Sequence, residues 1–345
     1  MTKSLTRRAL ATMAAGAFAL ASLPGAAKSQ DTELLFNVFI PQAAPLFTKG
    51  LEPWARAVEA ASNGTLTLTI PTSSLAPPPR LFDIVQDGVA DIAVAPISFR
   101  ENQFALDLIG SVPLIAPTAR GASVALWDTH KTYFAEADKW DDFVLLTLFT
   151  LGAPAIISNA HPIRSKADLD GFKVLAVGDV NVTVWDALGA SPVSGSGQKP
   201  FETLSSGVAD GATNPLGTAA VQGLLDASKS VTLVPGGFGG RAVFALFISR
   251  DRFEDLPEQA QTALISASGA DAAAKFGQIM DDIDASGLKK FQDKGIEIIQ
   301  ASDSFVAEIE TAGAFAVEDW LNEAKSAGID GTAALAHFKT IATRD

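Results

Sequence analysis

The apolar residues in the first third of the chain switch between strand-like and helix-like spacing. Residues 34–40 (LLFNVFI) form a short run of β-formers, which predicts a buried strand. Large apolar residues then recur at helical spacing over 51–58, and residues 65–70 (TLTLTI) alternate strictly, as a strand does. Prolines open a second short helix over 77–87, and a strand is predicted at 91–97. This β-α-β-α-β order indicates a mainly parallel sheet with helices on both faces.

A second series of the same kind begins near residue 170. Residues 172–177 (FKVLAV) predict a strand, and residues 208–213 (VADGAT) predict a shorter one. Between them, residues 181–189 and 201–207 carry helical patterns. The second half of the chain therefore predicts another α/β domain.

Two nine-residue stretches, one in each series, are nearly alike. Gly88–Pro96 reads GVADIAVAP, and Gly207–Pro215 reads GVADGATNP. Each stretch follows a helical run, and its glycine can take the left-handed conformation that ends a helix. We interpret the pair as one helix–glycine–strand corner used in two similarly wound domains; a chance match of four letters is the alternative.

The rest of the chain predicts elements that the two domains share. Apolar strands long enough to pass between domains are predicted at 143–149, 230–235 and 242–249. From Pro257 the chain is mostly helical, and no low-complexity linker separates its parts. The expected parts are a signal peptide over 1–27, domain I over 28–152 completed by parts of 240–345, and domain II over 153–239 completed by the C-terminal helices.

The first residues have the pattern of an export signal. Lys3, Arg7 and Arg8 precede an apolar run over 9–23 that is too short to span a bilayer. The stretch resembles a twin-arginine signal, and a Sec signal is the alternative; either one predicts a periplasmic protein. Loss of these three cations changes the formal charge from −13 to −16. So acidic a chain is not expected to bind nucleic acid or an anionic membrane.

Candidate catalytic and metal-binding residues are sparse. The chain has no cysteine, and its three histidines lie far apart without metal-ligand spacing, so we expect neither metal nor cofactor. We interpret those histidines as surface or loop residues, and the pair Asp281-Asp282 as a solvated helix face. Residues 236–241 (GGFGGR) precede a strand rather than a helix, which favours a turn or hinge over a dinucleotide loop. The sequence thus favours a binding protein over an enzyme.

A ligand is expected beyond the carboxyl ends of the strands, where open α/β sheets bind solutes. The second nine-residue stretch places Thr213 and Asn214 at such an end. The Asn214 amide offers both a donor and an acceptor to a polar solute. Its alternative role is to cap a turn before Pro215.

Several stretches taken together resemble the periplasmic solute receptors of TRAP transporters, the DctP type. They are LDGFKVLAV, LGASPV and FETLSSGVADGATNPL, with further similar segments in the same order across nearly the whole mature chain. The resemblance implies a two-domain periplasmic binding protein, or clamp, that closes on one small solute. It also implies delivery of that solute to a small and a large membrane subunit of an ion-driven transporter. A signalling receptor module and a periplasmic enzyme on a similar fold are the alternatives.

The chain departs from this family where the family binds carboxylates. The two arginines expected from the resemblance are replaced by Leu175 and Pro154, and an aromatic residue by Gly197. Asn214 is retained. An unpaired buried carboxylate is costly, so we expect a ligand that is not a typical arginine-bound carboxylate, unless another cation replaces the arginines. Arg241 is our candidate for that cation; the alternative is an exposed arginine paired with a carboxylate.

Aromatic residues near the strand ends could make the binding cleft more apolar than is usual for the family. The candidates are Phe39, Phe99, Phe149 and Phe238. The alternative for each is an ordinary place in the core.

Overall fold

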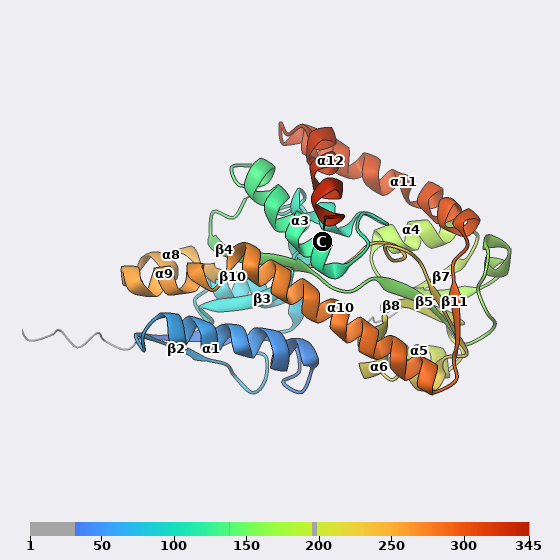
Figure 1. Cartoon of the computed structure of the whole chain (residues 1–345), viewed down its shortest axis with the longest axis horizontal. Helices are drawn as coiled ribbons and strands as arrows, with labels where there is room; N and C mark the ends of the chain where they lie inside the picture. The colour runs from blue at the N-terminus through green and yellow to red at the C-terminus, as the bar shows by residue number, and fades with distance from the viewer. Residues whose placement is uncertain (1–31, 138, 195–198, 345) are drawn as a thin grey trace, which may run out of the picture. The chain divides into compact units, whose positions relative to one another are not determined.

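Two β-sheets organise the chain, as the computed structural model in Figure 1 shows. The structure describes residues 32–137, 139–194 and 199–344. The predicted signal peptide and Gly197 lie outside these residues. The mixed α/β architecture with two sheets confirms the predicted fold class.

Sheet I has five strands and carries the first predicted series. Its strand order is β2 (Leu66–Thr69), β1 (Thr32–Asn37), β3 (Ile92–Pro96), β10 (Val243–Ser249) and β4 (Phe143–Thr150). β1 pairs in parallel with β2 and β3, which confirms the parallel core predicted from the β-α-β-α-β order. β10 runs antiparallel to both β3 and β4.

Sheet II has six strands and carries the second series. Its strand order is β11 (Glu297–Gln300), β9 (Ser230–Leu233), β5 (Pro154–Ser158), β8 (Gly211–Pro215), β6 (Lys173–Ala176) and β7 (Ser191–Ser194). β6 is parallel to β7 and β8, whereas β5 is antiparallel to β8 and β9.

Helices cover both faces of both sheets. Their bounds are α1 (Glu52–Ala61), α2 (Leu81–Gln86), α3 (Ala119–Thr129), α4 (Asp179–Ala187), α5 (Pro200–Ser205), α6 (Leu216–Val221), α7 (Leu224–Ala227), α8 (Arg250–Glu254), α9 (Glu258–Ser266), α10 (Gly269–Asp293), α11 (Asp303–Ser326) and α12 (Gly331–Ala342). Short 3-10 or π-helical turns lie at Phe47–Leu51, Pro78–Arg80, Ile97–Arg100, Asp107–Ser111, His130–Phe134 and Lys166–Leu169. In the part of the chain that the structure describes, no helix is both long and apolar enough to cross a bilayer.

The cores sit on the two faces of each sheet. In β10, Phe247 packs with residues of α2 and α3, whereas Leu246 packs with residues of α1 and α10 on the other face. In β5, Ile156 packs with α4 and α11, whereas Ile157 packs with α6 and α7. Burial on both faces explains why these strands are continuous apolar runs rather than alternating ones.

The repeated stretches form the same corner in both sheets. Gly88 and Gly207 have φ values of +69° and +73° and end α2 and α5. The next two backbone N–H groups in each case donate to one carbonyl of the preceding helix, that of Ile84 in α2 and that of Thr203 in α5. This is the glycine-terminated helix stop that the sequence predicts.

An aspartate then fastens each corner to the neighbouring strand. The N–H of Asp91 donates to the Leu35 carbonyl, and the N–H of Leu35 donates to the Asp91 carboxylate at 2.6 Å. Asp210 makes the same two bonds with Lys173, the second at 2.9 Å. The four letters GVAD therefore specify one local structure in two places, which argues against a chance match.

Short loops, rather than strands, join the two sheets. β4 ends at Thr150 in sheet I and β5 begins at Pro154 in sheet II, so residues 151–153 make the first crossover. Residues 234–242 make the second, from β9 to β10. The sequence predicts strands that pass between the domains, but each strand belongs to a single sheet. An extended strand cannot turn as sharply as glycine-containing segments can.

Helix α10 is the third connection and packs against elements of both sheets. It contacts α3 and β4 on the side of sheet I and α6 on the side of sheet II, and Figure 1 shows it running along both (orange). A Cβ on Gly277 would lie 2.6 Å from the Ala119 carbonyl oxygen, and one on Gly287 would lie 2.5 Å from the Gly217 nitrogen. These two glycines allow close backbone contact on either side, as predicted for a shared long helix.

Candidate functional site

The two crossovers and the strand ends that they join define a region that we call the junction. In both sheets the ends reached by the crossovers are the carboxyl ends of the parallel strands, because β10 and β5 run antiparallel to β3 and β8. The four steps from Thr150 to Pro154 can span at most about 14 Å. The carboxyl edges of the two sheets therefore meet at the junction, which is where open α/β sheets bind ligands.

A stack of phenylalanines lies at the sheet I side of the junction. The ring of Phe39 is 6.0 Å from that of Phe244 with an interplanar angle of 14°. The next two contacts are tilted rather than stacked: Phe244, at the start of β10, lies 5.6 Å from Phe149 at 35°, and the ring of Phe149 lies 4.9 Å from that of Phe276 of α10 at 36°. Phe149 is fully buried and Phe39 only partly so. The stack thus leads from the core to a partly exposed ring.

The other candidate phenylalanines have different surroundings. Phe99 lies in the turn after β3 and has 42% of its surface exposed. Phe238, in the second crossover, is fully buried and stacks on Trp185 of α4 at 4.1 Å. The Trp185 Nε1 and the nearby Asn181 Oδ1 are buried atoms without a hydrogen-bond partner among the described residues.

Thr213, Asn214 and Leu175 lie at the sheet II side. Leu175 pairs in register with Ala212, and both belong to the core beneath α6 and α7. Asn214 is two residues further along β8 on the same face and is partly exposed. Its Nδ2 donates to Gln222 Oε1 at 2.8 Å. The side chain thus bonds to Gln222 instead of capping a turn at Pro215.

Arg241 is buried, with 3% of its surface exposed, so the alternative of an exposed arginine is wrong. Its Nη1 donates to the Leu151 carbonyl in the first crossover at 3.2 Å. Its Nη2 donates to the carbonyls of Ala116 and Pro117, each at 3.2 Å. The Nε atom is buried and has no acceptor among the described residues. The ligand role of Arg241, like that of the seven other candidates, stays a prediction.

Two aspartates of α10 face Arg241, and sequence reasoning did not select either as functional. Asp281 accepts hydrogen bonds from the N–H groups of Ala119 and Arg120, at 2.7 and 2.9 Å, and so caps the start of α3. Its interpretation as part of a solvated face is therefore wrong. Asp284 accepts from the Gly217 N–H at 3.0 Å and from the N–H of Ala153.

Burial changes the acidity of Asp284 and of Arg241. Desolvation raises the pKa of Asp284 to about 6, and Asp281 adds to this effect, whereas the bonds from Gly217 and Ala153 and the charge of Arg241 oppose it. Desolvation lowers the pKa of Arg241, which the two aspartates partly offset. Arg241 stays protonated in any case, because arginine does not lose its proton in proteins. The cluster therefore holds one cation and two carboxyl groups.

A sequence signal for Asp284 was available. Gly277, Met280, Asp284 and Gly287 follow one another at steps of three and four, so a carboxylate falls on the buried stripe of an otherwise apolar helix face. A carboxylate in such a position needs a hydrogen-bond donor or a cation as its partner. Because the helix is shared by two domains, that partner is expected among the segments that it packs against. The partner could not be identified from the sequence, because Arg241 lies on a separate crossover.

The histidines give no metal site. His130 is buried, with its Nδ1 2.9 Å from Asp107 Oδ1, so its interpretation as a surface or loop residue is wrong. His161 is exposed and His337 is paired with Asp128. Across the described ranges, no three potential ligands come together around a metal position.

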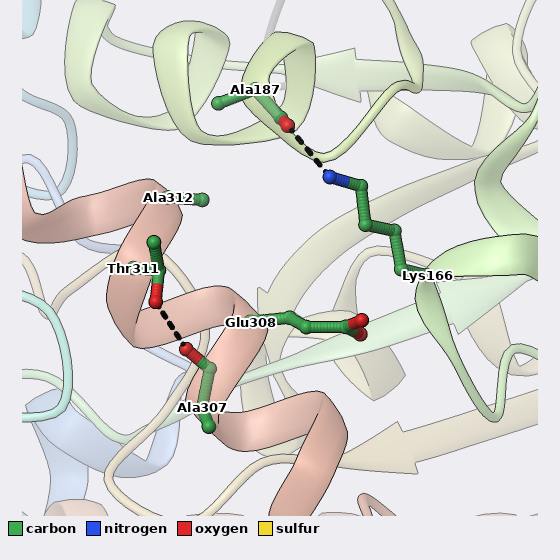
Figure 2. A pocket seen from close by; sticks show the side chains of 6 residues that line it. All are labelled: Lys166, Ala187, Ala307, Glu308, Thr311 and Ala312. Atoms are coloured by element: carbon green, nitrogen blue, oxygen red, sulfur yellow. Dashed lines mark hydrogen bonds between the residues drawn. The ribbon is translucent and has the colours of Figure 1, made fainter.

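A pocket of about 430 Å³ lies away from the junction (Figure 2). It is bounded by the 3-10 turn at 166–169, the end of α4 and one side of α11, and its lining residues are Lys166, Ala187, Ala307, Glu308, Thr311 and Ala312. Lys166 Nζ donates to the Ala187 carbonyl at 3.4 Å, and the Thr311 hydroxyl donates to Ala307. Its charged residues are exposed, and none of its lining residues belongs to a crossover.

Comparison with known proteins places the chain among solute receptors. The family model described as bacterial extracellular solute-binding protein, family 7 (DctP) matches residues 37–323. A protein of Comamonas testosteroni named outer membrane transporter protein TsaT is 30% identical over 322 residues, which cover 93% of this chain and 94% of that protein.

Solved structures agree. A TRAP periplasmic solute-binding protein from Bordetella bronchiseptica with bound (R)- and (S)-mandelate superposes with a TM-score of 0.84 at 29% identity, over 91% of this chain and 99% of that one. A marine metagenome TRAP protein specific for aromatic acids, in complex with 3-hydroxybenzoate, gives a TM-score of 0.81 at 28% identity, again over 91% and 99% of the two chains.

Proposed function

We propose a ligand class for this chain, which belongs to the bacterial extracellular solute-binding proteins of family 7. It is a periplasmic solute receptor of the TRAP type, a family of receptors rather than enzymes. The ligand that we propose is a small aromatic acid, bound at the junction mainly through its ring. The receptor performs no chemistry on it.

The observation that carries this proposal is the phenylalanine stack at the junction. Phe39 stacks on Phe244 and is only partly buried. An aromatic ring placed against Phe39 would extend the stack, and such contacts contribute about 1 kcal/mol beyond the apolar area that they bury. The aromatic acids bound by relatives at 28–29% identity support the same ligand class.

The acid group needs a donor, because Leu175 replaces the arginine that the family resemblance leads us to expect. The buried Nε–H of Arg241 has no acceptor among the described residues, so we propose that it serves the acid group. One such contact is weaker than a bidentate pair, which shifts more of the binding free energy to the ring.

Calorimetric titration with matched ligands tests the ligand class. Benzoate, mandelate and 3-hydroxybenzoate should bind and raise the melting temperature, because a ligand of the folded state stabilises it by mass action. Cyclohexanecarboxylate, with the acid but no aromatic ring, should bind about fivefold more weakly, which corresponds to the loss of about 1 kcal/mol. Phe39→Leu should remove most of that preference and leave the unliganded melting temperature nearly unchanged. Equal binding of aromatic and saturated acids would refute the proposal.

Delivery to a transporter is the second part of the proposal. TRAP solute-binding proteins bind small solutes and work with membrane subunits, and we propose a small and a large integral membrane protein as the partners here. We also propose that the N-terminal segment directs export by the twin-arginine or the Sec route. Uptake of the labelled ligand into vesicles that hold both subunits should require this receptor. Uptake at the same rate without it would exclude the transport role.

A further inference from the structure

We propose that Asp284 is a proton-sensitive positioning residue of the junction, so that capture of an aromatic acid is accompanied by uptake of a proton at its carboxylate. This inference rests on the proposed function. Asp284 belongs to α10, contacts the first crossover and faces the second. None of the functional assignments above requires it.

Asp284 ties together the segments on which any movement between the two sheets must act. It accepts the N–H of Gly217 at the start of α6 and the N–H of Ala153 in the first crossover. A Cβ on Gly152 would lie 1.6 Å from Asp284 Oδ2, so this crossover lies directly against the carboxylate. Arg241 in the second crossover bonds to Leu151 in the first. One carboxylate thus contacts α6 and the first crossover and faces the second.

Asp284 lies between the two glycines at which α10 packs closely against the two sheets' helices, in the stretch that would bend if the angle between the sheets changed. Gly277 presses against α3 on the sheet I side, and Gly287 presses against the start of α6 on the sheet II side. Because both contacts are backbone to backbone, each end of this stretch follows its own sheet. A change in the angle between the sheets is therefore taken up over residues 278–286, which contain Asp284.

Few other charges face Asp284, so its titration is simple to interpret. Arg241 faces it from the second crossover and Asp281 from its own helix. Arg120, at the start of α3, contacts Asp281 through its backbone N–H. Residues 151–153 and α6 carry no titratable side chain. Desolvation brings the pKa of Asp284 to about 6.

The direction of the coupling follows from charge. With both aspartates ionised, Arg241 faces two negative groups, and an anionic ligand would add a third. Protonation of Asp284 leaves one cation against one carboxylate and releases the charge of Arg241 for the acid group. Closure of the junction also removes water, which favours the neutral carboxyl group. Ligand affinity should therefore increase as the pH falls.

Titration calorimetry with 3-hydroxybenzoate between pH 7.5 and 5.5 tests this coupling, since the ligand stays ionised throughout. The Kd of the wild type should fall by about threefold to tenfold over this range. Asp284→Asn should show no such change. Asp282→Asn is the matched control: it removes a charge of the same kind two residues away, where the exposed side chain accepts a hydrogen bond from Gln278, and it should behave as the wild type. The same pH profile in wild type and Asp284→Asn would overturn the proposal.

A second measurement needs no folded Asp284 variant. Titrations of the wild type at pH 6.5 in two buffers with different ionisation enthalpies give the number of protons taken up with the ligand. We expect a fraction of one proton in the wild type and in Asp282→Asn. No uptake in the wild type would also overturn the proposal.

Failure of the ligand class can be told apart from failure of the positioning role. If 3-hydroxybenzoate does not bind at any pH, the proposed function fails, and hydrogen exchange of the ligand-free protein tests Asp284 instead. The protection factors of the Gly217 and Ala153 amides are measured in the wild type and divided by those in Asp284→Asn. This ratio should exceed one at pH 8 and approach one at pH 5, because the ionised carboxylate is a stronger acceptor than the amide of asparagine and the protonated carboxyl group is not. A constant ratio over this range would refute the positioning role.

Discussion

The residues that set the properties of the junction are a buried cation and two carboxylates on different segments of the chain. The Nη atoms of Arg241 donate hydrogen bonds to three carbonyls, and the carboxylates of Asp281 and Asp284 accept hydrogen bonds from backbone N–H groups. Each charged group is thus hydrogen-bonded, and the charge of Arg241 acts on both partly buried carboxylates. Because one of these groups has a shifted pKa, the free energy of unfolding should depend on pH.

Asp284→Asn should change how the free energy of unfolding depends on pH. The folded pKa of about 6 lies above the ordinary aspartate pKa of 3.8, so the native state binds this proton more tightly than the unfolded state. Its ionised form therefore lowers stability by about 3 kcal/mol above pH 6, and the loss is recovered as the pH falls from 6 toward 4. The difference between wild-type and variant stability, from urea unfolding at pH 4.5 and 7.5, should change by about 2 kcal/mol in favour of the wild type at pH 4.5, because at pH 4.5 most but not all of the loss is recovered. Parallel profiles would contradict it.

Arg241→Met should destabilise the protein by about 3–5 kcal/mol, because it leaves two partly buried carboxylates without their cation. Urea unfolding at pH 7.5 measures the loss. Arg241→Lys keeps the charge but not the guanidinium geometry, and it should recover part of the stability while aromatic-acid affinity stays low. Full affinity in Arg241→Lys would show that the Nε–H does not bind the ligand.

At the scale of elements, the corners could be predicted from sequence and the crossovers could not. Gly88 and Gly207 end helices by a local rule, so four letters were sufficient to specify both corners. Arg241 was selected by its position, yet its burial depends on carbonyls at 116, 117 and 151, which no local pattern brings to it. Asp281 was misassigned for the same reason, because its partner is the start of a helix 162 residues away.

Alanine substitutions at the two corner glycines should cost the same in both halves of the molecule. A Cβ at Gly88 or Gly207 would meet nothing within 4 Å, so the only penalty is the left-handed backbone conformation. Gly88→Ala and Gly207→Ala should each destabilise by about 1–2 kcal/mol in thermal unfolding. Asparagine, which tolerates this conformation better, should cost less at both positions. A much larger loss at one corner would show that the two are not equivalent.

At the scale of the whole molecule, two sheets meet along their carboxyl edges through two loops and one shared helix. The second crossover contains four glycines with positive φ, at 236, 237, 239 and 240. A chain that must change direction there without strain needs glycine. This places the deformable backbone next to the candidate ligand contacts, so we expect that binding at the junction and any movement between the sheets would involve the same residues.

The stacking of Trp185 on Phe238 gives the receptor a built-in optical reporter. Of the five tryptophans, Trp185 alone stacks on a crossover residue, and the other four lie in or against the cores of sheet I. Any shift of the second crossover would change the surroundings of this indole and therefore its emission. Ligand titration of the unlabelled protein should give a saturable fluorescence change that Trp185→Phe abolishes and Trp54→Phe does not. Rapid-mixing traces of that signal would time the movement itself, without a dye or a coupled transporter.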